Sequence, residues 1–166
     1  MAIREVVSVP HPVLSRQALE VNFFDEELAK LVGDMCDTMV VSPGCVGLAA
    51  VQIGVPLAIF VADVAGHKKT RSYNGLIVAI NPVITAKSKP IKVREGCMSV
   101  ADFTGAIERF SNVTLRAQNC NGEIFEIETD GFEAQAIQHE VDHLNGMVFL
   151  DRIMSPDNLY PRKRYL

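Results

Sequence analysis

The sequence has 166 residues, of which 48% are hydrophobic and 22% are charged, and its formal net charge is -4 at pH 7. A chain of this length and apolar content can bury the core of one domain, so we expect a single domain over residues 1–166 without disulfide or structural-metal support. The negative net charge argues against a general nucleic-acid binder or membrane-surface binder, because both need a broad cationic face.

Three features of the sequence indicate the cellular compartment of the protein. The four cysteines form no Cys-x-x-Cys pair, and the first residues show no charged segment followed by an apolar signal core. The longest apolar runs fall well short of the roughly 20 residues that a membrane span requires. These features predict a cytoplasmic protein in a reducing environment with no membrane partner, while the matrix of an organelle remains an alternative.

The first predicted element is an amphipathic helix that follows Asp25. The Asp25 carboxylate can cap its amino terminus, and Glu26 and Glu27 suit the positive end of the helix dipole. The helix should end near residues 42–44, where Ser, Pro and Gly follow one another. Apolar residues recur between these limits at helical spacing, at Leu28, Leu31, Val32, Met35 and Met39.

Short runs rich in β-branched residues then predict strands. Three of them are separated by clusters of Gly, Pro, Asn and Lys: residues 57–62, 76–80 and 91–93. Further along, residues 113–117 alternate apolar and polar side chains, and Asn121-Gly122 supplies a turn before another run at 124–127. We expect these last two runs to form a hairpin.

The last predicted helix covers about residues 132–144. Asp130 can cap it, and Gly146 can end it in a left-handed conformation. The order of helix, strands and helix, with connections too short for repeated crossover helices, favours an α+β fold over a doubly wound one. The pattern assigns no structure to the tail after Asp151.

This last helix carries the strongest chemical signal, the segment Gln-His-Glu-Val-Asp-His at residues 138–143. His139 and His143 lie four residues apart, so both imidazoles leave one face of the helix and can share one metal ion. Glu140 lies about 100 degrees round the axis, where it can act on a water molecule beside the metal without ligating the metal. The plain alternative is a buried helix with two unrelated histidines.

A zinc metalloprotease is the second interpretation of this pair, and it needs a third ligand downstream. Neither a histidine nor a glutamate follows His143, and Phe149 stands where the extended metzincin motif places its third histidine. The third ligand must then come from upstream. Cys97 stands out among the candidates, because Gly96 precedes it at the end of a strand-like run. One thiolate and two imidazoles leave a fourth position for water, as in catalytic rather than structural sites.

A third segment, residues 44–54, consists of small and apolar residues with one amide, Gln52. Small side chains allow another backbone to approach, and an isolated amide in an apolar wall needs a hydrogen-bond partner, which an oxyanion could provide. Equally, Gln52 could bond to nearby main chain in a glycine loop that enters a buried segment. The segment is not a phosphate loop, because no Lys-Ser or Lys-Thr pair follows the glycines.

Together the three segments resemble the motifs of the peptide deformylase family, which run Gly-Leu-Ala-Ala-x-Gln, Glu-Gly-Cys-Leu-Ser and Gln-His-Glu-x-x-Asp-His. In this chain they span residues 47–52, 95–99 and 138–143. Order and spacing agree along most of the chain. Two positions depart from the pattern: Cys45 is similar to the organellar branch, where bacterial members usually have glycine, and Met98 replaces the usual leucine. These departures leave substrate preference more open than reaction type.

The resemblance implies hydrolysis of the formyl group from the N-terminal formylmethionine of nascent polypeptides. It implies one divalent metal ion on Cys97, His139 and His143, with Fe²⁺ as the physiological ion and Zn²⁺, Ni²⁺ or Co²⁺ as ions that the same ligands accept. Glu140 would act as the general base and would then pass the proton to the leaving amine.

The resemblance also implies how the substrate is held. The Gln52 amide and the Met98 N–H would stabilise negative charge on the formyl oxygen. The peptide would dock as an added strand against Val46, Gly47 and Gly96. The implied fold has small mixed or antiparallel sheets around a central C-terminal metal-binding helix, with one N-terminal helix.

Other polar residues receive simpler interpretations. By resemblance, Glu95 and Arg109 pair to orient the cysteine strand; the alternative is two separate surface charges. We expect the remaining cysteines and histidines to be plain small residues and solvent-facing residues respectively: Cys36, Cys120, His11 and His67. The basic tail at residues 162–164 allows a transient contact with ribosomal RNA, although a terminal charge run is more often only solvated.

Three other classes of function stay open. One is a non-catalytic homologue that binds formylated chains or metal, and another is a related metal-dependent amidase. The third is a thiol enzyme with Cys97 as nucleophile and a histidine as base. The presence of Glu140, Gln52 and all three candidate ligands argues against the non-catalytic homologue.

Overall fold

The computed structural model describes residues 2–163 of the chain. Every pairing between the strands of this part is antiparallel, and the sheet has the order β1-β2-β3-β4-β5, with β6 paired to β4. The predicted α+β fold is therefore confirmed. The described elements are α1 (Glu26–Val41), α2 (Gly131–Leu144), β1 (Gly47–Ala49), β2 (Ile59–Ala62), β3 (Ile77–Cys97), β4 (Val100–Gln118), β5 (Ile124–Asp130), β6 (Leu159–Pro161) and the short 3-10 helices η1 (Pro12–Ser15), η2 (Ala50–Ile53), η3 (Phe149–Arg152) and η4 (Pro156–Asn158).

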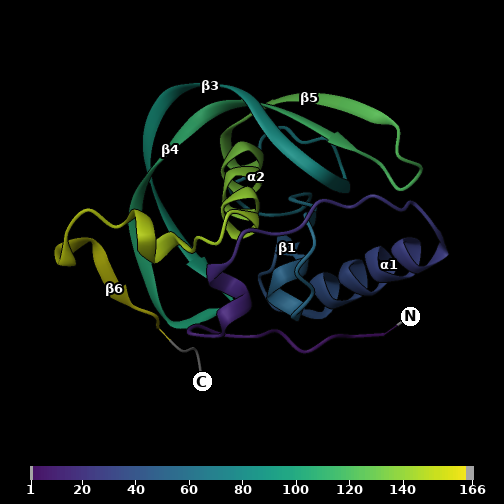
Figure 1. Ribbon diagram of the computed structural model, residues 1–166. Helices are drawn as coiled ribbons and strands as arrows, with labels where there is room; N and C mark the ends of the chain where they lie inside the picture. The colour runs from purple at the N-terminus through teal and green to yellow at the C-terminus, as the bar shows by residue number, and fades with distance from the viewer. Residues whose placement is uncertain (1, 164–166) are drawn as a thin grey trace.

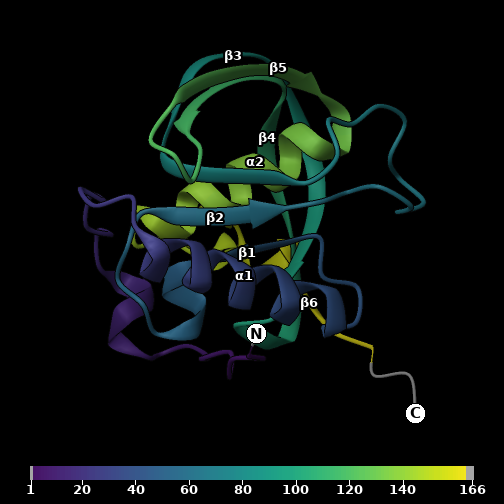
Figure 2. The ribbon, with the colours of Figure 1, turned by 90° about the vertical axis from the view of Figure 1, so that its right-hand side faces the viewer.

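Helix α2 lies at the centre of the molecule. Strands β3, β4 and β5 curve over one side of it, while β1, β2 and α1 lie on the other side (Figure 1 and Figure 2). Ala134, Ile137 and Leu144 of α2 are buried in one core cluster with Phe60 and Leu115 from the strands. Close packing on both sides makes α2 a rigid support for the side chains that it carries.

Helix α1 has the predicted bounds, and its amino terminus is capped as expected. The Asp25 carboxylate accepts a hydrogen bond from the Leu28 N–H at 3.0 Å. The apolar face of α1, which includes Met35, packs in a second cluster against Leu48 of β1 and Ile59 of β2. Strand β1 is thus fixed between the two helices. It is followed directly in the chain by η2, which contains the candidate site residue Gln52.

Strand β3 differs from the prediction of separate short strands, because residues 76–80 and 91–93 belong mostly to one strand of 21 residues. The polar cluster between these runs does not end the strand. Instead, Asn81 has φ 51°, and the register with β4 shifts between Ile80 and Val83. A β-bulge of this kind bends a strand without ending it, so residues that usually mark a turn remain inside the sheet.

The turns that flank α2 follow the sequence signals in part. Gly146 has φ 76°, so the left-handed stop is confirmed. Asp130 does stand at the N-cap position, but the prediction that its carboxylate caps the helix was wrong. That carboxylate instead accepts a hydrogen bond from the Ser72 hydroxyl at 3.0 Å, because the loop before β3 lies beside it.

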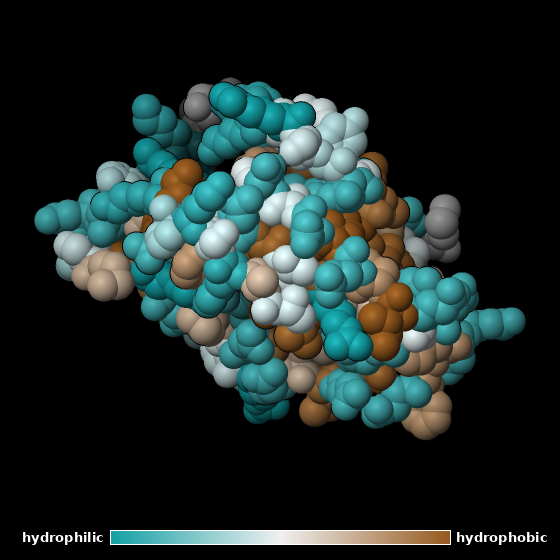
Figure 3. Space-filling model, turned by 90° about the horizontal axis from the view of Figure 1, so that it is seen from above, coloured by the Kyte–Doolittle hydropathy of each residue, from teal (hydrophilic) through white to brown (hydrophobic). Residues whose placement is uncertain are grey.

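The hairpin between β4 and β5 is confirmed. Asn119 accepts hydrogen bonds from the main-chain N–H groups of Asn121 and Glu123, and Gly122 has φ 80°. Seen from above the arch of β3, β4 and β5, hydrophilic side chains cover most of the surface and hydrophobic side chains show in patches between them (Figure 3). No helix within residues 2–163 is long and apolar enough to cross a membrane.

Candidate metal centre and active site

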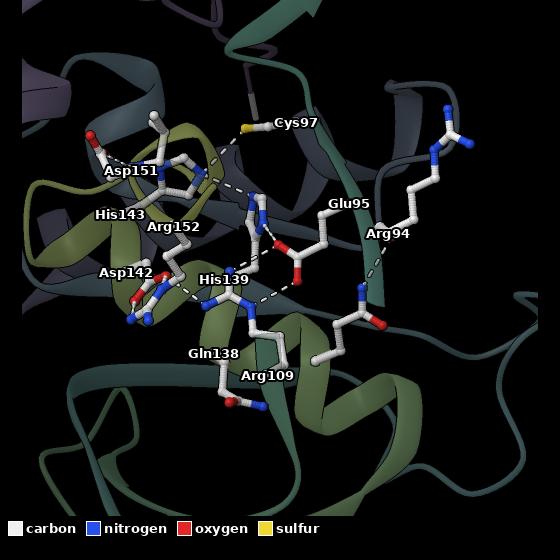
Figure 4. A network of polar contacts seen from close by, with 12 residues as sticks. Arg94, Glu95, Cys97, Arg109, Gln138, His139, Asp142, His143, Asp151 and Arg152 are labelled. Carbon is white, nitrogen blue, oxygen red and sulfur yellow. Dashed lines mark hydrogen bonds and ion pairs between the residues drawn. The ribbon is translucent and has the colours of Figure 1, made fainter. Parts of the chain in front are cut away.

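Three candidate ligands from two elements meet at one point beneath the arch. Cys97 ends β3, and His139 and His143 stand one turn apart on α2. The Cys97 Sγ lies 3.3 Å from His143 Nε2, which lies 3.2 Å from His139 Nε2 (Figure 4). All three ligand atoms lie within 4.8 Å of one another. One sulfur and two imidazole nitrogens at this spacing fit a single divalent transition-metal ion with a coordination position left over.

The protonation state of His143 is compatible with binding a metal ion. Its side chain is fully buried, and burial lowers its pKa well below the usual value for histidine. The ring is therefore neutral, which is the form that binds a metal.

Glu95 holds the other histidine in place. Its Oε1 lies 2.7 Å from His139 Nδ1, and its two oxygens accept a pair of hydrogen bonds from Arg109 at 2.8 and 2.9 Å. Burial by itself would raise the pKa of Glu95, but its bonds to Arg109 and His139 outweigh that effect and lower the pKa to about 2. Because Glu95 takes the Nδ1 side of the ring, the Nε2 of His139 is left facing Cys97. The predicted pairing of Glu95 with Arg109 is confirmed.

The sequence interpretation missed two further members of this network. Asp142 accepts a hydrogen bond from Arg109 Nη1 at 2.6 Å, and Arg152 of η3 donates to both Asp142 oxygens. Asp142 stands in the histidine motif itself, three residues after His139, so an acidic residue on the buried side of α2 was the available signal. No sequence pattern pointed to Arg152, because its contact with Asp142 depends on how the chain folds back after α2.

Glu140 is buried beside this cluster. Its Oε2 has no hydrogen-bond partner among the described residues, and burial is the main reason that its pKa is raised to about 7. A Cβ added at Gly47 would lie 2.6 Å from Glu140 Oε1, so the carboxylate packs directly against the Gly47 backbone. An unpaired buried carboxylate oxygen next to the candidate ligand atoms is costly unless a ligand or water engages it.

Gln52 combines the two interpretations that its sequence left open. Its Oε1 accepts a hydrogen bond from the Ala49 N–H at 3.0 Å, so one end of the amide does bond to nearby main chain. Its Nε2 donates to the Ser99 hydroxyl at 3.2 Å and lies 3.5 Å from Cys97 Sγ. The amide N–H group is thereby fixed next to the candidate metal site.

A cavity of about 390 Å³ opens onto this centre. It is lined by the predicted substrate-binding residues Val46, Gly47 and Gly96, and by Met98. Within the described residues, β1 pairs only with β2, and the second half of β3 pairs only with β4. Each of these two strands therefore has an open edge, and these edges belong to the segments that line the cavity.

Two of the simpler expectations hold and one was wrong. Cys36 and Cys120 pack half-buried against the second core cluster, and His11 is exposed. His67 is not a solvent-facing residue: its ring is partly buried and stacks on Phe132 with centroids 4.3 Å apart, at the edge of the cavity. This contact joins a loop to α2, and sequence spacing alone gives no sign of it.

Comparisons with known proteins agree with this arrangement. A sequence model of the polypeptide deformylase family matches residues 3–158. The peptide deformylase of Wolinella succinogenes is 38% identical over 96% of this chain and 91% of its own length, and peptide deformylase 1 of Bacillus cereus is 41% identical over 92% of this chain and 94% of its own length.

Solved structures give the same result. The peptide deformylase of Thermotoga maritima superimposes with a TM-score of 0.85 at 36% identity, over 93% of this chain and 100% of that chain. The peptide deformylase of Ehrlichia chaffeensis in complex with actinonin superimposes with a TM-score of 0.86 at 38% identity, over 93% of this chain and 91% of that chain. The chain belongs to the polypeptide deformylase family.

Proposed function

We propose that this protein is a metal-dependent peptide deformylase, which hydrolyses the N-formyl group from the N-terminal formylmethionine of newly made polypeptides. The observation that carries the proposal is the convergence of Cys97, His139 and His143 next to a buried carboxylate, Glu140, with an unpaired oxygen. A linear amide hydrolase needs a metal position, a base and a donor to the carbonyl oxygen, and this cavity contains a candidate for each.

Cys97, His139 and His143 would hold one divalent ion, and we favour Fe²⁺, although the same donors suit Zn²⁺, Ni²⁺ and Co²⁺. When bound, the ion would supply a Lewis acid that polarises the formyl carbonyl and lowers the pKa of water. The bond from His139 to Glu95 would keep the ring from turning away when the ion binds.

Glu140 would move the proton. Its unpaired oxygen takes a proton from the attacking water as the oxygen–carbon bond forms, and it gives that proton to the amine as the carbon–nitrogen bond breaks. Formate and a free amino terminus result. Burial raises the pKa of Glu140, so its carboxylate accepts a proton more readily than an exposed one would.

Gln52 Nε2 and the Met98 N–H would stabilise the negative charge that develops on the formyl oxygen. The Gln52 amide cannot rotate freely, because the Ala49 N–H holds its carbonyl end. A donor fixed before the reaction costs no reorganisation when charge appears. Met98 follows Cys97 in the turn between β3 and β4, so its N–H is next in the chain to a candidate ligand.

The substrate would enter as an extended strand along the open edges near Val46, Gly47 and Gly96. Nascent formylmethionyl chains occur where translation starts with formylmethionine, so we place the protein in the cytoplasm or in an organellar matrix. Contact with the ribosome stays a prediction from the sequence, and Arg164 of the basic tail lies outside the described residues.

The test is anaerobic turnover of formyl-Met-Ala-Ser by protein purified with ferrous iron, with metal content measured on the same sample. We expect close to one metal per chain and release of formate. Cys97→Ala should lose metal and activity together, while Glu140→Gln should keep metal and lose about 10²- to 10⁴-fold in kcat. Full metal without turnover would instead favour a binding homologue or another amide substrate.

A further inference from the structure

The cavity that contains the candidate metal centre has a positively charged mouth, although the whole chain carries a net charge of -4. Lys69, Arg94 and Arg162 all line it. The acidic residues that line it are Glu95 and Glu140. Glu95 is already engaged by Arg109 and His139, and Glu140 lies buried at the candidate catalytic centre.

The strand register places two of these cations around the point where the peptide is expected to dock. Gly96 of β3 stands opposite Thr104 of β4, which stands opposite Tyr160 of β6. Side chains two residues apart on a strand share a face. Arg94 therefore lies on the Gly96 side of β3, and Arg162, two residues after Tyr160, comes to the same face.

Side-chain contacts agree with this placement. The Arg94 Nε donates to the Thr104 hydroxyl at 3.0 Å, and its guanidinium lies 4.2 Å from the centre of the Tyr160 ring. A Cβ added at Gly96 would collide with the Arg162 guanidinium, so this group lies directly over the Gly96 backbone. The Arg162 main chain is fixed in turn, because its N–H donates to the Asp102 carbonyl at 2.8 Å. Arg162 is thus a wall of the cavity and not part of a free basic tail.

The third cation comes from the loop between β2 and β3. Its Lys69 N–H donates to His67 Nδ1 at 3.2 Å, and the His67 ring stacks on Phe132 of α2. The Lys69 ammonium lies 5.9 Å from the centre of the same Phe132 ring. A tertiary contact therefore holds this loop, and its charge, at the edge of the cavity.

None of the three cations forms an ion pair with any residue of the described part of the chain. Among residues 2–163, their hydrogen bonds and ring contacts orient these cations without neutralising their charge. Like charges around one opening raise its potential and attract anions from solution. The partner that would complement them must therefore bring negative charge into the mouth of the cavity.

We propose that Arg94, Arg162 and Lys69 form an anionic subsite that selects peptides with aspartate or glutamate at the second and third residues after the formylmethionine. The proposal rests on the proposed deformylase function and adds a substrate class to it. Arg94 is two residues from Gly96, a distance of about 7 Å along an extended strand, so it would meet a peptide side chain about two residues beyond the one beside Gly96. A guanidinium can bind a carboxylate there with two hydrogen bonds.

The experiment compares kcat/KM for formyl-Met-Ala-Asp-Asp and formyl-Met-Ala-Asn-Asn, both amidated at the carboxyl terminus so that only side chains carry charge. We expect the acidic peptide to be favoured about 3- to 10-fold at low salt, and the preference to disappear near about 0.5 M NaCl. In Arg94→Gln and Arg162→Gln the ratio should fall towards one. Lys163→Gln is the matched control, because Lys163 is exposed next to Arg162 and does not line the cavity.

Binding gives a readout that does not depend on catalysis. The acetyl-Met forms of the same two peptides, titrated calorimetrically, should show the same preference. Equal kcat/KM for both formyl peptides, or a preference that survives in both arginine variants, would overturn the proposal. If no formyl peptide is hydrolysed, the proposed function fails, and the affinities of the acetyl peptides still decide whether the anionic subsite exists.

Discussion

The position of Glu140 can be tested through Gly47, which packs against it. A methyl group added at Gly47 would lie 2.6 Å from Glu140 Oε1 and 3.0 Å from its Cγ and Cδ. Non-bonded carbon atoms prefer about 3.5–4.0 Å, so in Gly47→Ala the glutamate must move by about 0.5–1 Å. Turning the carboxylate alone does not relieve the contact, because Cγ is involved too.

We expect this displacement to lower kcat about 10- to 100-fold, because a misplacement of about 1 Å can cost about 10²-fold in rate. Metal content should stay unchanged, since none of the candidate ligands contacts the new methyl group among its nearest atoms. The measurement is steady-state deformylation with metal analysis on the same sample. A rise in KM with kcat unchanged would mean that the methyl group blocks the peptide instead, and full activity would refute the assignment of Glu140 as the base.

Gly33→Ala is the matched control, because it adds the same methyl group in α1 where no atom lies within 4 Å. Its activity should be unchanged. The free energy of unfolding should rise by up to about 1 kcal/mol, because alanine favours a helix interior over glycine by that amount.

Two further predictions concern the charge networks. Arg109→Ala should weaken metal retention about 10- to 100-fold during dialysis against a chelator, because Glu95 then loses the partner that holds it against His139; unchanged retention would show that Glu95 needs no such support. The hydrogen bond from Arg4 holds the pKa of Asp34 below its usual value, so this carboxylate stabilises the fold above its unfolded pKa and that contribution is lost as the pH falls through the folded pKa. In urea denaturation, Asp34→Asn should therefore lower stability more at pH 7 than at about pH 3, and an equal loss at both would contradict this account.

The helices were predictable because their signals are local. The Asp25 cap and the apolar spacing of α1 lie within one segment, and both appear in the structure. The same logic failed at Asp130, where a side chain that could cap α2 binds Ser72 from a distant loop instead. A capping residue competes among all the donors that the fold brings to it, and the sequence shows only the nearest ones.

The long strands were less predictable. Pro82 and Pro90, with polar neighbours, read as breaks, yet β3 continues through both. The bulge after Ile80 and the positive φ of Lys89 allow the strand to curve around α2. The curvature of the strand depends on how the sheet packs around α2, and no single segment of the sequence shows that packing.

The candidate site was predictable where one element or one motif carried it. The helical spacing of His139 and His143 predicts a shared position, and the structure places Cys97 beside them. Asp142, Arg152 and His67 were missed, because each acts through a partner from another part of the chain.

Alternation along the end of β3 separates the candidate metal ligand Cys97 from the cation Arg94 of the proposed anionic subsite. Glu95 and Cys97 are buried towards α2, whereas Arg94 and Gly96 are exposed at the mouth of the cavity. Figure 4 shows Glu95 and Arg94 leaving opposite sides of the strand. Because side chains alternate with a period of two, a shift of one residue in this strand would exchange the two faces, so that Gly96 or Met98 would take the place of Cys97. The pairing of β3 with β4, which includes Gly96 opposite Thr104, therefore fixes the candidate metal ligand and the proposed anionic subsite together.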